Sequence, residues 1–147
     1  MITSTVASTL LEDVVLTPDE RFALSVDGSA TNQGIVSYST RQNAIVSSLS
    51  TSAQAVAISP RSREVVLMAQ FFNDSIHRFV IRPDGTLEDS GQSILTGTGP
   101  INIIFSPSGE FAFVAAQNDI SISVLSTLKA SKNPAVFSMR RGDAARV

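Results

Sequence analysis

The chain carries one short motif three times, and this repetition constrains its fold more than any other feature. In each copy an apolar residue is followed by Thr or Ser, then Pro, a polar turn and a second apolar stretch. The copies begin at Leu16, Ile58 and Phe105, and their prolines lie 42 and then 47 residues apart. A period of about 40 to 50 residues is typical of one four-stranded blade of a β-propeller. The spacing therefore predicts a repeat protein whose units stack on their neighbours.

Alternating apolar and β-branched residues surround each motif, and no helical stripe is present. Proline ends the first strand of each repeat because it has no N–H for the ladder. The predicted strands cover residues 14–16, 21–26, 35–39 and 44–49, then 56–58, 64–69, 75–81 and 87–95, then 102–105, 110–115, 120–125 and 135–139. The predicted fold is all-β: a partial β-propeller of about three four-stranded antiparallel blades in an incomplete ring.

The whole chain is interpreted as one repeat domain, with blades over residues 13–50, 55–96 and 101–139. Residues 1–11 are expected to form the outer strand of a preceding blade, and residues 128–147 a weakly ordered tail. A two-sheet sandwich is the alternative, since it also has regular strands and turns. The recurring Ser/Thr-Pro turn after the first strand favours the propeller.

Composition excludes several classes of function. A formal net charge of −2 offers no basic face for nucleic acid and no polybasic run for a membrane. The absence of cysteine excludes disulfides, thiolate nucleophiles and zinc–thiolate sites. No apolar run reaches the length of about 18 residues that spans a bilayer, and the N-terminus lacks the basic start of a signal peptide. The compartment stays open, with the cytoplasm favoured, and no cofactor is predicted.

Three aspartates, Asp27, Asp74 and Asp119, follow the second strands of the three repeats. In a propeller these loops gather on one face around the channel mouth, where carboxylates could hold a polar ligand or a hard cation. The alternative is that they cap turns, because Asp and Asn tolerate left-handed backbone. No metal ligand is assigned, since the carboxylates are scattered through turns. The predicted ligand-binding residues are Asp27, Asn73, Asp74, Asn102, Asn118 and Asp119.

The single histidine, His77, does not by itself indicate catalysis. A Ser-His-Asp apparatus needs it beside an activated serine and an orienting carboxylate. Strand alternation places His77 on the same face as Phe79 and Ile81, which predicts a packed histidine. No catalytic residue is assigned.

Two stretches resemble the YVTN-repeat and lactonase-like propellers of the 6-phosphogluconolactonase type. Residues 73–87 contain a strand, an Asp-Gly turn and a Thr-Leu pair that begins the next strand. Residues 97–116 contain a Gly-Pro pair that begins the first strand of the repeat, a Ser-Pro-Ser-Gly turn and a second strand with aromatic residues. The resemblance covers residues 13–127 and implies a ring of about seven blades. The chain departs from the family where lactonase-like members often carry Arg and His after Gly-Pro, because Ile101 and Asn102 stand there and Gln54-Ala55 in the preceding repeat.

Three blades cannot close a ring, so the end blades would expose apolar faces. The chain is expected to be a fragment of a longer protein, or to form a homodimer that closes a six-bladed ring. The predicted function is a binding or scaffold module for a small molecule or protein on the propeller face, without catalysis by this chain alone. The alternative is part of a lactonase-like hydrolase of a sugar lactone or other cyclic ester, with its site completed by missing blades or a second chain.

Overall fold

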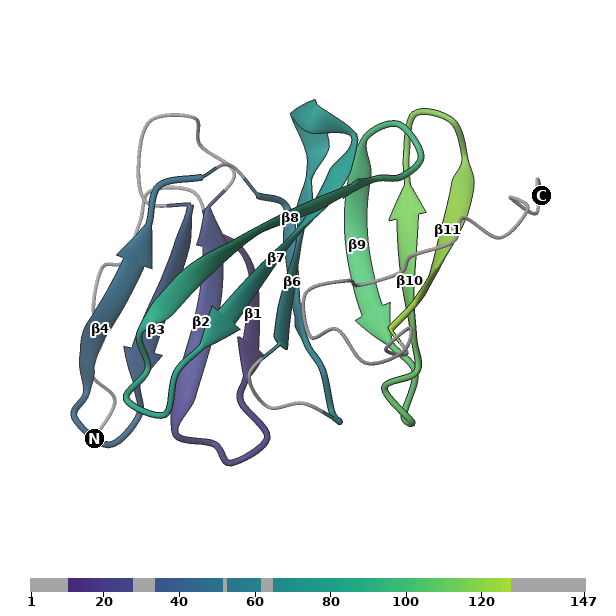
Figure 1. The fold of residues 1–147 in the computed structure, drawn as a ribbon. Helices are drawn as coiled ribbons and strands as arrows, with labels where there is room; N and C mark the ends of the chain where they lie inside the picture. Colours follow the sequence, from purple (N-terminus) through teal and green to yellow (C-terminus); the bar gives the residue numbers. More distant parts are fainter. Residues whose placement is uncertain (1–10, 28–33, 52, 62–64, 128–147) are drawn as a thin grey trace.

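The computed structural model describes residues 11–27, 34–51, 53–61 and 65–127. In these residues three antiparallel sheets stand side by side, with the second sheet between the other two (Figure 1). Strand order follows the chain in each sheet: β1-β2-β3-β4 in the first blade, β5-β6-β7-β8 in the second and β9-β10-β11 in the third. This is the arrangement of successive propeller blades, and it confirms the predicted all-β partial propeller.

The strand bounds are β1 (Leu11–Leu16), β2 (Phe22–Asp27), β3 (Ile35–Ser39), β4 (Ala44–Leu49), β5 (Ala55–Ile58), β6 (Val65–Gln70), β7 (Ser75–Ile81), β8 (Leu87–Leu95), β9 (Pro100–Phe105), β10 (Phe111–Ala116) and β11 (Ser121–Ser126). β1 begins earlier than predicted because its first residues include Glu12 and Asp13, which the apolar pattern does not mark as strand, and β9 begins at Pro100, two residues before the predicted start at Asn102. The strand predicted at 135–139, the tail at 128–147 and residues 1–10 of the predicted preceding strand lie outside the described residues.

The Ser/Thr-Pro motif closes the turn between the first two strands of a blade. In the first blade, Thr17 Oγ1 accepts a hydrogen bond from Phe22 N at 3.1 Å, and Thr17 N donates to the Phe22 carbonyl oxygen at 2.9 Å. In the third blade, Ser106 Oγ accepts from Phe111 N at 3.2 Å, and Ser106 N donates to the Phe111 carbonyl oxygen at 2.8 Å. In these two blades the hydroxyl before the proline therefore fixes where the next strand begins.

Two apolar clusters hold the blades together. The first lies between the first and second blades and contains Phe22, Leu24, Val26, Ile35, Ala53, Val56, Ile58, Phe79, Ile81 and Leu87. The second lies between the second and third blades and contains Ala55, Ala57, Ala69, Ile76, Ile103, Ala112, Val114 and Leu125. The second blade is covered on both faces, which explains why its inner strand is apolar throughout.

A single turn of 3₁₀ helix, η1 (Phe71–Asn73), lies in the loop between β6 and β7. It ends at Asp74, whose backbone is left-handed with φ of 50°. Asp is one of the few residue types that adopt this conformation at modest cost. The Asp74 carboxylate lies beside residues 96–99, the linker to the third blade, where its Oδ1 accepts a hydrogen bond from Gly99 N. Within the described residues no helix is long or apolar enough to cross a lipid bilayer.

Candidate binding site on the inner strands

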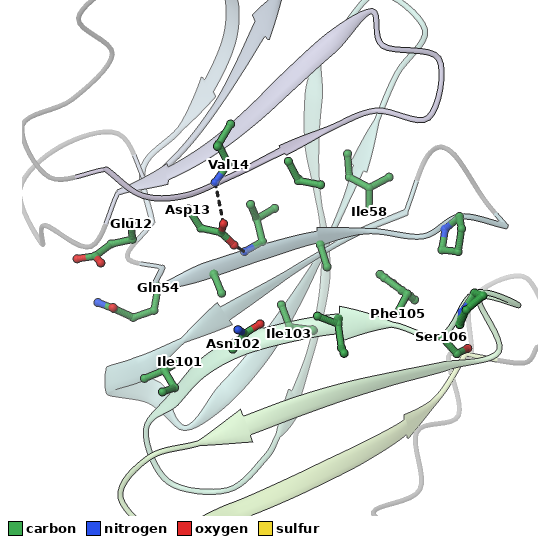
Figure 2. A pocket seen from close by; sticks show the side chains of 17 residues that line it. Glu12, Asp13, Val14, Gln54, Ile58, Ile101, Asn102, Ile103, Phe105 and Ser106 are labelled. Atoms are coloured by element: carbon green, nitrogen blue, oxygen red, sulfur yellow. Dashed lines mark hydrogen bonds between the residues drawn. The ribbon is translucent and has the colours of Figure 1, made fainter.

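A hollow of about 610 Å³ runs along the first strands of the three blades. Figure 2 shows β5 lying between β1 and β9, with side chains of all three strands around the hollow. The first strand of each blade is the inner strand, which in a complete propeller surrounds the central channel. The hollow is therefore the part of the channel wall that these three blades contribute.

One end of the hollow is polar. Glu12, Gln54 and Asn102 line this end, close to where their strands begin (Figure 2). Glu12 and Gln54 occupy equivalent positions, four residues before the last apolar residue of each inner strand, Leu16 and Ile58. A carboxylate accepts hydrogen bonds, and amides both donate and accept them. This end can therefore bind a ligand that carries several hydroxyl groups.

The Asp13 carboxylate lies at the same end but bonds to backbone. Its Oδ2 accepts a hydrogen bond from Val56 N at 3.1 Å, and its Oδ1 accepts from Val14 N at 2.8 Å (Figure 2). The bond to Val56 joins β1 to β5 across the boundary between the first two blades. Asp13 therefore positions the inner strands, and Glu12 is the carboxylate that the geometry makes available to a ligand.

The remainder of the hollow is mostly apolar. Val15, Ala57 and Ile103 form part of its wall, and Ile58 and Phe105 lie toward the end opposite Glu12 (Figure 2). An apolar cavity with a few polar groups at one end is the usual composition of a small-molecule site, since the polar groups orient the ligand.

Among the six predicted ligand-binding residues, only Asn102 lines this hollow. Asp74 and Asp119 instead hold the linker between β8 and β9. Asp74 Oδ1 accepts a hydrogen bond from Gly99 N at 2.8 Å, and Asp119 Oδ2 accepts from Thr98 N at 3.0 Å. The structure thus brings these two carboxylates to one linker from the second and third blades.

The same linker contacts Asn118, whose N donates to the Thr98 carbonyl oxygen at 3.0 Å. Gly99 has φ of 68°, and a Cβ there would lie 2.7 Å from Asn118 Nδ2 and 2.9 Å from the Phe71 ring. Glycine is therefore required at this position by backbone conformation and by space. Asn118 makes this contact through its backbone, whereas Asp74 and Asp119 contact the linker through their carboxylates.

Among the residues that the structure describes, no side-chain contact with this linker is found for the other two predicted residues. Asp27 ends β2 and is buried, with its N donating to the Gly34 carbonyl oxygen at 3.0 Å. Asn73 Nδ2 donates to Gln70 Oε1 at 3.1 Å, within the loop that contains η1. Ligand binding at these two residues, and at the linker group, stays a prediction.

The histidine and the carboxylates suggest no catalytic or metal centre in the described part of the chain. His77 is half-buried on β7, with its ring centroid 6.3 Å from that of Phe79, and does not line the hollow. Among the described residues, no three His, Cys, Asp or Glu side chains converge as metal ligands would. The described groups with clearly shifted pKa values, Asp19, Arg78, Asp84 and Glu88, also lie outside the hollow. Hydrogen bonds are the main cause that lowers the pKa of the three carboxyls, and burial lowers the pKa of Arg78.

Glu12 and Gln54 were not predicted from the sequence. The signal that could have identified them is their shared position four residues before the end of the inner strand. That signal is weak, because the third repeat has Ile101 at the same position. The three repeats therefore do not share one type of side chain at this position. Only the structure shows that Glu12 and Gln54 line the same end of the hollow.

Residues 23–136 match the family described as "Lactonase, 7-bladed beta-propeller". The chain belongs to this family. No protein in the curated set matches the sequence. The resemblance predicted from residues 73–87 and 97–116 is thereby confirmed at the level of the family.

Solved structures show the same fold. A functionally unknown protein from Desulfotomaculum acetoxidans is 36% identical, with a TM-score of 0.78 over 86% of this chain and 41% of its own. A "putative 6-phosphogluconolactonase" from Bacteroides fragilis is 15% identical, with a TM-score of 0.74 over 93% of this chain and 39% of its own. Kuenenia stuttgartiensis hydrazine synthase is 20% identical, with a TM-score of 0.66 over 86% of this chain and 36% of its own. The chain thus spans well under half the length of each of these structures.

Proposed function

We propose that this lactonase-family chain is a binding module that holds a small polyhydroxylated molecule at the polar end of the inner-strand hollow. The observation that carries the proposal is the placement of Glu12, Gln54 and Asn102 at one end of a hollow of about 610 Å³ whose wall also includes aliphatic side chains. Hydroxyl groups of the ligand would donate to the Glu12 carboxylate and exchange hydrogen bonds with the two amides. The carbon skeleton would lie against the aliphatic wall.

Sugar acids and their lactones have this combination of hydroxyl groups and a compact carbon frame. The family name supports this ligand class, since lactonases act on cyclic esters. No acid, base and nucleophile are seen to converge at the hollow among the residues that the structure describes. Binding without turnover by this chain alone is therefore the proposed activity.

Hydrolysis of a sugar lactone by a complete ring is the second candidate, and the family match is the observation that favours it. Glu12 would then be a residue near the reacting ester, and the remaining groups would come from other blades or a second chain. The Ile101 and Asn102 side chains argue against a catalytic Arg and His at the entry of β9. The two candidates differ in whether lactone is consumed.

The test is titration of the purified chain with gluconate, 6-phosphogluconate and glucono-1,5-lactone, followed by NMR chemical shifts and calorimetry. We expect at least one probe to bind, with affinity reduced about tenfold or more in both Glu12→Gln and Gln54→Ala. Gln54→Ala loses a hydrogen bond of roughly 1.5 kcal/mol. Glu12→Gln replaces a charged acceptor by a neutral amide, whose hydrogen bonds are about half as strong, and puts an NH₂ donor where a carboxylate oxygen stood. Glu20→Gln is the matched control because Glu20 is exposed in a turn and does not line the hollow.

Equal binding by Glu12→Gln and the unmodified chain would contradict the placement of the site. Loss of glucono-1,5-lactone above its spontaneous rate, abolished in Glu12→Gln, would replace the binding proposal by the hydrolase candidate. No binding of any probe would remove sugar acids and lactones as the ligand class.

A further inference from the structure

A second hollow, of about 290 Å³, lies where three turns of the first two blades gather. They are the turn between β1 and β2, the turn between β3 and β4, and the turn between β7 and β8, which lie at the same end of these blades (Figure 1). We call this space the turn hollow. Its lining residues are Arg21, Phe22, Ser39, Arg41, Gln42 and Asp84.

Hydrogen bonds and packing fix the three turns relative to one another. Thr40 N donates to the Arg21 carbonyl oxygen at 3.0 Å, and Thr40 Oγ1 donates to the Glu20 carbonyl oxygen at 2.8 Å, which joins the first two turns. The buried Phe22 ring packs on the third turn so closely that a Cβ on Gly85 would lie 2.4 Å from the Phe22 Cε1 atom. The wall of the turn hollow is therefore preorganised, which lowers the entropic cost of binding a ligand there.

Two arginines from different turns bring positive charge to the turn hollow. The Arg21 guanidinium carbon lies 5.3 Å from the centroid of the Phe22 ring, a cation–π contact that orients the guanidinium. Arg41 lies two residues after the end of β3, in the turn that is bonded to the Arg21 carbonyl oxygen. Within the described part of the chain, neither Arg21 nor Arg41 forms an ion pair with a carboxylate. Both guanidiniums are therefore available to an anionic ligand.

The carboxylates near these arginines are bonded within their own turns. Asp84 lines the turn hollow, and its Oδ1 accepts a hydrogen bond from Thr86 N at 2.9 Å. Asp19 Oδ1 accepts from Thr17 Oγ1 at 2.7 Å and from Arg21 N at 3.2 Å. These bonds hold both carboxylates to the backbone of their turns, so the donors of the two guanidiniums remain the main hydrogen-bonding groups of the turn hollow.

We propose that the turn hollow binds a compact dianion, a phosphate or dicarboxylate group, between the Arg21 and Arg41 guanidiniums. Each guanidinium presents paired N–H donors that match the spacing of two anionic oxygens. The Gln42 side-chain amide supplies a further donor. Because the arginines are exposed and Asp84 repels an anion, we expect a dissociation constant on the order of 1 mM that rises with salt concentration.

This inference goes beyond the proposed function and does not depend on it. The turn hollow and the inner-strand hollow share no lining residue. Glu12→Gln should therefore bind phosphate as tightly as the unmodified chain does. Failure of one proposal leaves the other intact.

The test is an NMR titration of the whole chain at about pH 8 and constant ionic strength, with sodium phosphate in one series and malonate in another. We expect saturable shifts of the backbone amide signals of Arg41, Gln42 and Asp84. Arg41→Gln and Arg21→Gln should each weaken binding about fivefold or more, and Arg41→Lys, which keeps the charge but loses the paired donors, about threefold. Arg61→Gln is the matched control, because Arg61 is an exposed arginine that pairs with Glu110 outside the turn hollow.

Asp84→Asn separates a local site from a general attraction of anions to the chain. The change removes one negative charge beside the arginines and keeps an acceptor for Thr86 N, so it should strengthen binding about twofold or more. Asp89→Asn is its matched control. Asp89 Oδ1 likewise accepts a backbone hydrogen bond, from Gly91 N at 2.8 Å, but Asp89 does not line the turn hollow. Asp89→Asn should therefore change binding less than Asp84→Asn.

Saturable binding of phosphate, of malonate or of both supports the site, and the stronger ligand shows which oxygen geometry the two arginines prefer. Shifts that rise linearly with concentration for both anions would overturn the proposal. An equal loss of binding in Arg61→Gln and Arg41→Gln would also overturn it, as would binding that Asp84→Asn leaves unchanged.

Discussion

The two boundaries between blades differ in the size of the side chains that are buried there. The first is filled by large side chains, among them Phe22, Leu24, Ile35 and Phe79. The second is rich in alanine, with Ala55, Ala57, Ala69 and Ala112 among its buried residues. Since apolar stabilisation scales with buried area at about 25 cal/mol per Å², alanines contribute less per residue.

The second boundary has a hydrogen-bonded linker that compensates for its smaller side chains. Residues 96–99 receive contacts from both blades: Asp74 accepts from Thr96 N through its carbonyl oxygen at 2.8 Å and from Gly99 N through its carboxylate, also at 2.8 Å. From the third blade, Ser123 Oγ accepts from Gly97 N at 3.1 Å. Hydrogen bonds also cross the first boundary, such as the one from Val56 N to Asp13 Oδ2. The two boundaries therefore differ in the volume of their buried side chains and in the hydrogen-bonded linker that the second one adds.

Leu24→Ala should have the largest effect on stability, because it empties a fully buried position of the volume-filled boundary. We expect the free energy of unfolding to fall by about 2 to 5 kcal/mol. Urea denaturation followed by circular dichroism measures the change. Phe72→Ala, at a side chain 72% exposed, is the control and should shift the midpoint little. A loss below about 1 kcal/mol for Leu24→Ala would mean that the boundary collapses around the cavity.

Asp74→Ala should reveal the dependence of the second boundary on its linker. The variant removes the acceptor for Gly99 N and places Ala in left-handed backbone, so we expect a loss of about 2 kcal/mol. Asp74→Asn keeps a carbonyl acceptor and tolerates the left-handed conformation, and it should lose much less. Amide hydrogen exchange should show faster opening of β9 in Asp74→Ala than in Asp74→Asn. Equal stability of the two variants would refute a role for the linker bond.

Gly109→Ala and Glu20→Gly compare the equivalent turns at the two boundaries. Both residues have positive φ, 68° and 58°, but a Cβ at Gly109 would lie 2.7 Å from Arg61 Cβ of the second blade. Gly109→Ala should therefore destabilise by about 1 to 3 kcal/mol. Glu20→Gly relieves backbone strain in the folded state but increases the conformational entropy of the unfolded chain. Because the two effects oppose each other, the free energy of unfolding should change by no more than about 0.5 kcal/mol. Thermal unfolding of both variants measures which one loses more stability. A larger loss in Glu20→Gly than in Gly109→Ala would contradict the prediction.

Acid should produce the smallest effect, and part of it should come from the turn of the first blade. The Thr17 hydroxyl donates to Asp19 and lowers the pKa of its carboxyl below the usual 3.8. Because the pKa is lower in the folded state, this stabilisation is present above pH 3.8 and is lost as the pH falls through the lowered value. Asp19→Ser, which copies Ser108 of the third blade, should flatten the change in urea midpoint between about pH 5 and pH 2. If the urea midpoint of Asp19→Ser changed with pH as much as that of the unmodified chain, the contribution of Asp19 would be contradicted.

Most strands could be predicted because their signals are local. The strand over residues 87–95 was predicted at its observed bounds, since Asp84-Gly85 marks its start. The first residues of β1 were missed because Glu12 and Asp13 are polar, and their place in the strand depends on the partner strands. The candidate site was largely missed for the same reason: Asn102 was identified, but Glu12 and Gln54 become neighbours only when the blades stack.

Local sequence patterns determined the strands, the Ser/Thr-Pro turns and the membership of a propeller family, because each depends on residues close together in the sequence. Tertiary structure decided which carboxylates hold a linker and which end of the inner strands is polar. Those outcomes depend on contacts between residues 25 to 43 positions apart, such as Asp74 with Gly99 and Asp13 with Val56. No local pattern encodes such distances, since they arise only when apolar faces pack blade against blade.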